Sequence, residues 1–138
     1  MARVPRRVVA SWVDGRAFKC ETENGNQLLT DGNRKYGASP MELLLAGMAG
    51  CTGIDVVDIL QKKRCDVKGL QVCVEGVRAD DYPMVYTDIS VVYIVKGTDI
   101  PAQAIEEAIH LSESKYCSAS LMLGKTAKIT SRYEVVAE

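Results

Sequence analysis

The sequence predicts an α+β fold, with antiparallel strands around one long buried central helix, in a single domain spanning residues 1–138. Three observations predict it. The N-terminal third alternates apolar and polar residues between hairpin signals, and a long apolar segment without strand punctuation follows. A strand pair, a second helix and a last strand then complete the chain. A length of 138 residues is usual for one domain.

The N-terminal third predicts a three-stranded meander. Asp14-Gly15 and Asn24-Gly25 are dipeptides typical of tight hairpin turns, because their central positions need residues that tolerate positive φ. The strands that these turns separate are expected at Val4–Val13, Arg16–Glu23 and Gln27–Thr30.

The central helix is expected to begin after Ser39 and to run to about Lys63. Ser39 is a favourable N-cap, and Pro40 fits the first helical position. Glu42 follows the cap by three residues, which predicts a capping box.

The first half of this helix, Met41–Cys51, is apolar on nearly every face, and such a helix is normally buried on every face. Ala46, Gly47, Ala49 and Gly50 would let another backbone approach closely. One small domain can hardly enclose such a helix, so we expect a homodimer that packs two copies together. The alternative is a central helix wrapped by the protein's own sheet.

The C-terminal half predicts a second hairpin, further helix and a last strand. The polar segment Ala79–Met84 joins the two hairpin strands. The expected elements are strands Val67–Arg78 and Val85–Lys96, a helix Pro101–Lys115, a helical turn Cys117–Leu123 ended by Gly124, and a strand Ala127–Val136.

Composition excludes several classes of partner. The net charge of -1 offers no basic excess for phosphates, so we expect no nucleic-acid partner. The arginine-rich start Met1–Arg7 is not followed by a long apolar run, so it does not resemble a signal peptide. Met41–Cys51 is too short and too rich in glycine to span a bilayer. We therefore expect a cytoplasmic protein without a membrane partner.

Five cysteines and one histidine limit the metal and disulfide chemistry. An odd number of cysteines without a secretion signal argues against a structural disulfide framework. His110 is the only histidine, which argues against a Cys/His zinc site. We expect no cofactor and no metal. His110 and Glu106 are four residues apart on the second helix, as in a surface pair.

Two cysteines are candidates for chemistry. Cys51 lies in the apolar helix, where Gly47 leaves space one turn before it, and its alternative role is that of a small buried hydrophobe. Cys117 precedes a short helix and follows Lys115, a setting that would lower a thiol pKa, and its alternative role is a helix cap. We interpret the remaining cysteines as bystanders: Cys20, Cys65 and Cys73.

The segments around these cysteines resemble a known family. Gly37–Cys51 resembles the central helix of the OsmC/Ohr superfamily, and Ser114–Ser120 resembles its second cysteine motif. The two cysteines are 66 residues apart, as the family shows, and Tyr82–Ile89 resembles the hairpin before the second helix. The resemblance covers nearly the whole chain and is closest to the YhfA-like branch.

The resemblance implies an intertwined homodimer and thiol-dependent reduction of hydroperoxides, organic ones especially. In that scheme Cys51 attacks the peroxide and becomes a sulfenic acid, and Cys117 resolves it as a disulfide. A dithiol reductant, lipoyl or thioredoxin-like, then restores the two thiols.

The resemblance also implies an arginine from the first hairpin and a glutamate early in the helix. The matching positions hold Val13 and Met41. The candidates for these roles are therefore the neighbouring Glu42 together with Arg16 or Arg34.

Three functions stay open from the sequence. The first is a thiol peroxidase that uses Cys51 and Cys117. The second is a stress-response or small-ligand-binding protein of the same fold with little or no peroxidase activity. The third is a hydrolase or transferase with Cys51 as nucleophile, for which His110 is the only histidine base in the chain.

Overall fold

The computed structural model describes residues 3–137, and its internal contacts divide the chain into two compact units. The first unit is Met1–Leu44 and the second is Leu45–Glu138. Each unit is described by itself below. The expectation of a single domain over residues 1–138 stays a prediction.

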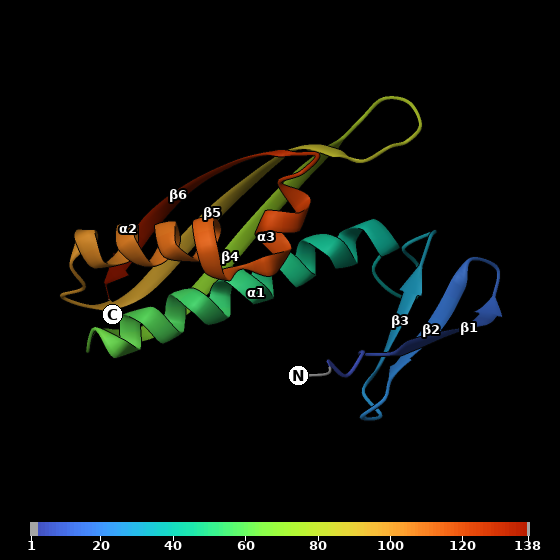
Figure 1. Ribbon diagram of the computed structural model, residues 1–138, viewed down its shortest axis with the longest axis horizontal. Coiled ribbons are helices and arrows are strands. Elements are labelled where there is room, and N and C mark those ends of the chain that lie inside the picture. The colour runs from blue at the N-terminus through green and yellow to red at the C-terminus, as the bar shows by residue number, and fades with distance from the viewer. Residues whose placement is uncertain (1–2, 138) are drawn as a thin grey trace. The chain divides into compact units, whose positions relative to one another are not determined.

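The first unit contains the predicted three-stranded meander, shown in blue in Figure 1. Its strands are β1 (Val8–Asp14), β2 (Ala17–Thr22) and β3 (Gln27–Asp31), and each neighbouring pair is antiparallel. Gly15 and Gly25 have φ values of 53° and 86°, the positive range that the hairpin signals predicted. The first strand begins at Val8 rather than at Val4.

The predicted capping box is present at the start of α1 (Pro40–Lys62). The Glu42 backbone N–H donates to Ser39 Oγ over 3.1 Å, and the Ser39 backbone N–H donates to Glu42 Oε1 over 2.8 Å. Two N–H groups at the helix start are satisfied reciprocally, which explains why the helix begins at this residue.

Only one stripe of α1 is fully buried, formed by Met48, Thr52, Val56 and Leu60 at intervals of four residues. The reason is that the second unit covers one side of the helix only. In the single chain the segment Met41–Cys51 is not buried on every face, since Leu44 is 47% exposed. Its complete burial was expected in a homodimer and stays a prediction. By length and composition α1 would also suffice to cross a membrane, although the core helix of a soluble protein passes the same test.

The second unit is built on a three-stranded sheet in the order β4-β5-β6. The strands are β4 (Asp66–Arg78), β5 (Tyr86–Thr98) and β6 (Lys128–Ala137). β4 and β5 form the predicted antiparallel hairpin, but β6 pairs with β5 in parallel. The expectation of antiparallel strands is thus wrong for β6.

The parallel pairing follows from the helical connection between β5 and β6, because parallel neighbours need a long crossover. The crossover consists of α2 (Ala102–Leu111), the π-helix η1 (Ser112–Tyr116) and α3 (Ser118–Leu123). The single helix expected over Pro101–Lys115 is therefore two segments, of which the second is wound as a π-helix. α3 agrees with the helical turn expected before Gly124.

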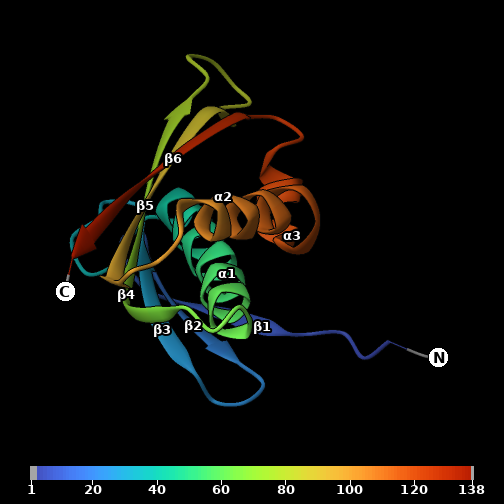
Figure 2. The same ribbon diagram turned by 90° about the vertical axis from the view of Figure 1, so that its left-hand side faces the viewer.

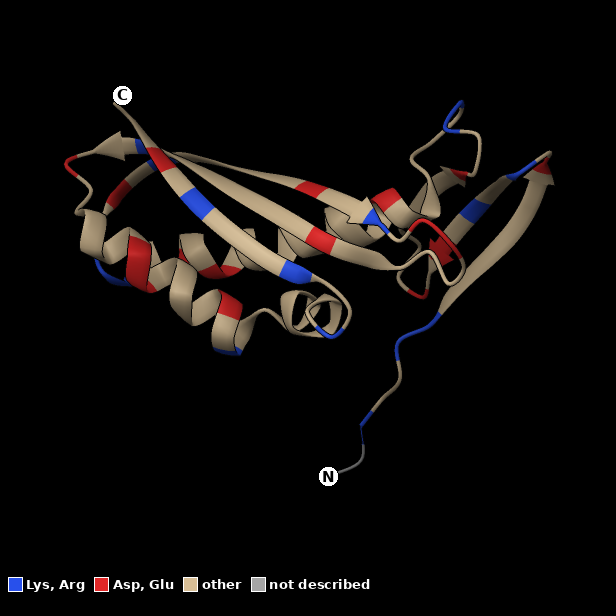
Figure 3. Ribbon diagram, turned by 90° about the horizontal axis from the view of Figure 1, so that it is seen from above, with Lys and Arg blue, Asp and Glu red and all other residues tan. Residues whose placement is uncertain are grey.

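The core of the second unit lies between the sheet and its helices. Figure 2 shows α2 and the part of α1 that belongs to this unit on the same side of the sheet. Alternate residues of β5 are buried on that side: Ile89, Val91, Tyr93 and Val95. Charged residues of both signs are interspersed along the strands, whereas the charged residues of α2 are both glutamates (Figure 3).

Candidate active site

The second unit brings the two candidate cysteines together. Cys51 is half-buried on α1, and a side chain at Gly47 would meet open space, as expected. Cys117 is fully buried and caps α3. The Cys51 side chain lies close enough to the Cys117 thiol to raise its pKa, so two residues distant in sequence share one site. Both are free thiols.

The environment of Cys117 opposes a thiolate, contrary to the sequence-based expectation. Burial raises the pKa of the Cys117 thiol, and its hydrogen bond to Cys51 raises that pKa further. Ser120 acts in the other direction, because its hydroxyl and backbone N–H donate to Cys117 Sγ over 3.0 and 3.3 Å. The expected cation, Lys115, has its Nζ over the Tyr116 ring instead.

The π-helix η1 places Cys117 in this position. The Cys117 backbone N–H donates to the Ser112 carbonyl over 2.7 Å, which closes the widened turn. Such single π-turns occur frequently at functional sites. No local pattern signalled the extra residue in this turn, because Pro101–Lys115 has an ordinary helical pattern.

A buried polar network lies beside the cysteine pair. Thr52 Oγ1 is 2.9 Å from Tyr93 Oη and 2.7 Å from Ser112 Oγ. Tyr93 donates to Glu113 Oε2 over 2.6 Å, and Ser112 donates to Asp55 Oδ2 over 3.0 Å. Burial, followed by the hydrogen bond to Glu113, raises the pKa of Tyr93. Sequence reasoning missed this network, although a threonine within the apolar stripe of α1 was a detectable signal.

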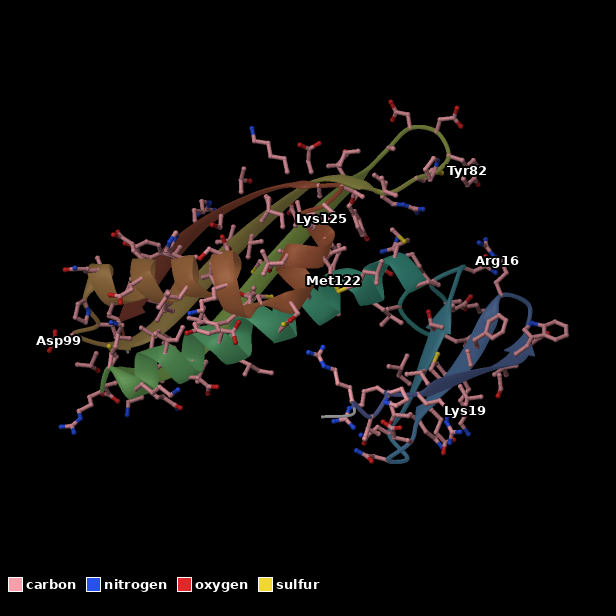
Figure 4. All side chains as sticks on the ribbon, viewed as in Figure 1. Arg16, Lys19, Tyr82, Asp99, Met122 and Lys125 are labelled. Atoms are coloured by element: carbon pink, nitrogen blue, oxygen red, sulfur yellow. The ribbon has the colours of Figure 1, made fainter. Side chains whose placement is uncertain are left out.

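The other three predicted site residues belong to the first unit. Arg34 Nη2 forms an ion pair with Glu42 Oε2 at 3.1 Å. The Ser39 backbone N–H is the main cause of the lowered pKa of Glu42, and Arg34 lowers it further. Arg16, at the turn between β1 and β2 (Figure 4), donates to Asn33 Oδ1 over 3.2 Å. Their proposed roles toward Cys51 stay predictions.

No cluster within residues 3–137 has three or more His, Cys, Asp or Glu side chains placed to hold a metal ion. The bystander cysteines Cys20 and Cys65 are half-buried, and Cys73 is exposed on β4. Glu106, the expected partner of His110, accepts a hydrogen bond from the Tyr133 phenol over 2.7 Å.

Comparison with known proteins agrees with this architecture. The family model of the OsmC-like proteins matches residues 31–132. Protein YhfA of Escherichia coli K12 is 46% identical over 127 residues, which cover 91% of this chain and 95% of YhfA.

Two solved structures show the same fold. A hypothetical protein from Aquifex aeolicus is 31% identical, with a TM-score of 0.89 and 99% of each chain covered. The organic hydroperoxide resistance protein OhrB of Bacillus subtilis is 17% identical, with a TM-score of 0.64, and the match covers 95% of this chain and 98% of OhrB. The family match and the identity to YhfA are sufficient for assignment: the chain belongs to the family of OsmC-like proteins.

Proposed function

We propose that this protein is a thiol-dependent peroxidase that reduces organic hydroperoxides, with Cys51 as the attacking thiol and Cys117 as the resolving thiol. One observation carries the proposal: the half-buried Cys51 thiol is close enough to the buried Cys117 thiol to raise its pKa, so the two thiols belong to one site. OhrB, a protein of the same fold, is described as an organic hydroperoxide resistance protein, which supports the choice of substrate.

The proposed reaction has two oxidative steps. The Cys51 thiolate attacks the O–O bond of the hydroperoxide, which breaks; Cys51 becomes a sulfenic acid and the alkoxide takes up a proton to leave as an alcohol. Cys117 sulfur then attacks Cys51 sulfur, the S–O bond breaks, and hydroxide leaves as water with the proton of the Cys117 thiol. The two thiols have lost two electrons to the peroxide.

An external dithiol, lipoyl or thioredoxin-like, restores the protein in this proposal. The reductant attacks Cys51 sulfur, because Cys117 is fully buried and Cys51 is only half-buried. Cys117 is then the leaving thiolate, and the two hydrogen bonds from Ser120 stabilise its charge. The second thiol of the reductant releases Cys51.

The proposal extends to the charged residues of the first unit. A peroxidatic thiolate needs a nearby cation or hydrogen-bond donors. We propose that Arg34, held by its ion pair with Glu42, or Arg16 meets this need. The variants Arg34→Lys and Arg16→Lys separate the two, since the one that serves the thiolate slows oxidation of Cys51 and the other does not.

A homodimer in the cytoplasm is also part of the proposal. A shallow groove of about 560 Å³ runs along α1 and β4 and is lined mainly by apolar and small residues: Ala49, Gly50, Gly53, Ile54, Val57, Leu70 and Val72. A second copy of α1 suits this groove, because its own small residues allow close approach. Sedimentation at micromolar concentration tests this, and a monomer there contradicts it.

A second candidate function is a binding or stress-response protein of the same fold with slow thiols. The raised pKa of Cys117 favours it, as do the contacts of Arg34 with Glu42 and of Arg16 with Asn33. In this case the apolar groove would accept a small hydrophobic ligand.

Oxidation of the reduced protein separates the two functions. The protein is mixed with a slight excess of cumene hydroperoxide, and disulfides are mapped by mass spectrometry over time. The peroxidase hypothesis expects rapid formation of a Cys51–Cys117 disulfide, its loss in Cys51→Ser, and no change in the control Cys73→Ser. Oxidation no faster than that of the exposed Cys73 thiol would rule out the peroxidase.

A further inference from the structure

Three buried hydroxyl groups connect the two cysteine-bearing segments. Thr52 directly follows Cys51 on α1, and its Oγ1 lies within hydrogen-bond distance of Tyr93 Oη and Ser112 Oγ. Thr52, Tyr93 and Ser112 are all fully buried. Tyr93 and Ser112 each donate their hydroxyl proton to a carboxylate. The single Thr52 hydroxyl proton can therefore be donated to only one of Tyr93 Oη and Ser112 Oγ at a time.

Ser112 transmits this connection to Cys117. It is the first residue of η1, and its carbonyl accepts the Cys117 backbone N–H over 2.7 Å. Its hydroxyl contacts α1 twice, through Thr52 Oγ1 at 2.7 Å and Asp55 Oδ2 at 3.0 Å. The start of the π-turn is therefore fixed to the helical turn that follows Cys51.

Tyr93 fixes the same turn to the sheet. Its phenol donates to Glu113 Oε2 over 2.6 Å, and Ser131 on β6 donates to Glu113 Oε1 over 3.0 Å. The turn before Cys117 is thus held by β5, β6 and α1. A valine at position 52 would match the apolar remainder of the α1 stripe, so the hydroxyl there is not needed for packing.

We infer that Thr52 and Tyr93 are positioning residues for the redox step: they hold the π-turn so that the Cys117 thiol stays against the Cys51 sulfur. This inference rests on the proposed function for its biological meaning. It predicts that the network controls formation of the disulfide from the Cys51 sulfenic acid, and leaves the preceding attack on the peroxide unchanged. Residues that only stabilised the core would not separate these two steps.

Matched variants test the positioning role. Thr52→Val removes the hydroxyl with nearly constant shape, and Thr52→Ser restores it. Tyr93→Phe removes the phenol hydrogen bonds, and the control Tyr133→Phe removes a comparable tyrosine–glutamate bond from the neighbouring strand. Thermal melts monitor the folding of each variant. If Tyr93→Phe does not fold, the comparison of Thr52→Val with Thr52→Ser tests the positioning role.

The first measurement needs no peroxide. Each variant is equilibrated in glutathione buffers of graded ratio, and the fraction with a Cys51–Cys117 disulfide is measured by mass spectrometry. Thr52→Val and Tyr93→Phe should lower the equilibrium constant for this disulfide about tenfold, as expected for the loss of a buried hydrogen bond. Thr52→Ser should rescue most of that loss. Wild-type equilibria in both disruptive variants, or an equal loss in Tyr133→Phe, would refute the inference.

The second measurement uses cumene hydroperoxide with dimedone, which traps sulfenic acids. Thr52→Val and Tyr93→Phe should give several-fold more dimedone adduct on Cys51, while the rate at which the Cys51 thiol is lost stays unchanged. If loss of the Cys51 thiol slows as much as disulfide formation does, the network does not act on the resolving step and the inference is wrong. If the wild-type protein is not oxidised, the proposed function fails, and the glutathione equilibria still decide the positioning role.

Discussion

Tyr93 and Tyr133 are register partners in the parallel β5–β6 pair, and each donates its phenol hydrogen to a glutamate of the helical crossover. Tyr93 is fully buried and reaches Glu113, whereas Tyr133 is half-buried and reaches Glu106. Two side chains of the same type, on the same face of the sheet, therefore make the same kind of bond in different environments.

This pair yields a prediction about stability. Tyr93→Phe should lower the free energy of unfolding by about 1–3 kcal/mol, because Glu113 and Thr52 lose a buried partner. Tyr133→Phe should change it by about 0.5 kcal/mol or less, because water replaces the lost bond. Urea unfolding followed by circular dichroism measures both. Equal losses of stability in the two variants would contradict the idea that the burial of Tyr93 makes its hydrogen bonds more costly to lose.

Removal of the Ser120 hydroxyl should make Cys117 harder to ionise. Ser120 lowers the pKa of this thiol and so opposes the effect of burial. Ser120→Ala should therefore raise the Cys117 pKa, and less thiolate should form at any pH near neutrality. Peptide-resolved labelling with a small methanethiosulfonate across a pH series gives the midpoint. Ser118→Ala, an exposed change in the same helix, is the control, and a lower midpoint in Ser120→Ala would contradict the prediction.

The loop after β3 should make the protein sensitive to acid. Backbone N–H groups of Asn33 and Tyr36 are the largest influences that hold the pKa of Asp31 below its usual value, and Lys35 adds a third. A depressed folded pKa gives stability that is present above the unfolded pKa of about 3.9 and is lost as pH falls through the folded value.

Asp31→Asn tests this dependence. The variant should be less stable than the wild-type protein at neutral pH, and its stability should fall less steeply with acidification. Thermal melts from pH 7 down to pH 3 give both curves. A parallel pair of curves would mean that Asp31 does not titrate differently in the folded state.

The capping box makes a prediction for the start of α1. Ser39→Ala should lower the free energy of unfolding by about 1 kcal/mol, because the Glu42 backbone N–H loses its acceptor. Ser39→Asp should retain most of the stability. In contrast, Ser114→Ala removes an exposed hydroxyl that donates to the His110 carbonyl, and should have little effect. A loss in Ser39→Asp as large as that in Ser39→Ala would argue against the cap.

Local patterns in the sequence were sufficient for most elements. The glycine turns at Gly15 and Gly25, and the reciprocal bonds of Ser39 and Glu42, depend on residues a few positions apart, so their interactions could be predicted directly. The pairing of Cys51 with Cys117 was accessible only through resemblance to a family, because no local rule brings residues 66 positions apart together.

The sequence by itself determined which segments form most of the helices and strands, where α1 begins, and which two cysteines are candidates for redox chemistry. Only the tertiary structure decided that β6 runs parallel to β5, that a π-turn precedes Cys117, and that burial raises the pKa of this thiol. The physical reason is one of range: capping and turn formation depend on neighbouring residues. Three features depend instead on which distant segments pack against each other and exclude water: the direction of β6, the desolvation of Cys117, and the network of Thr52, Tyr93 and Ser112.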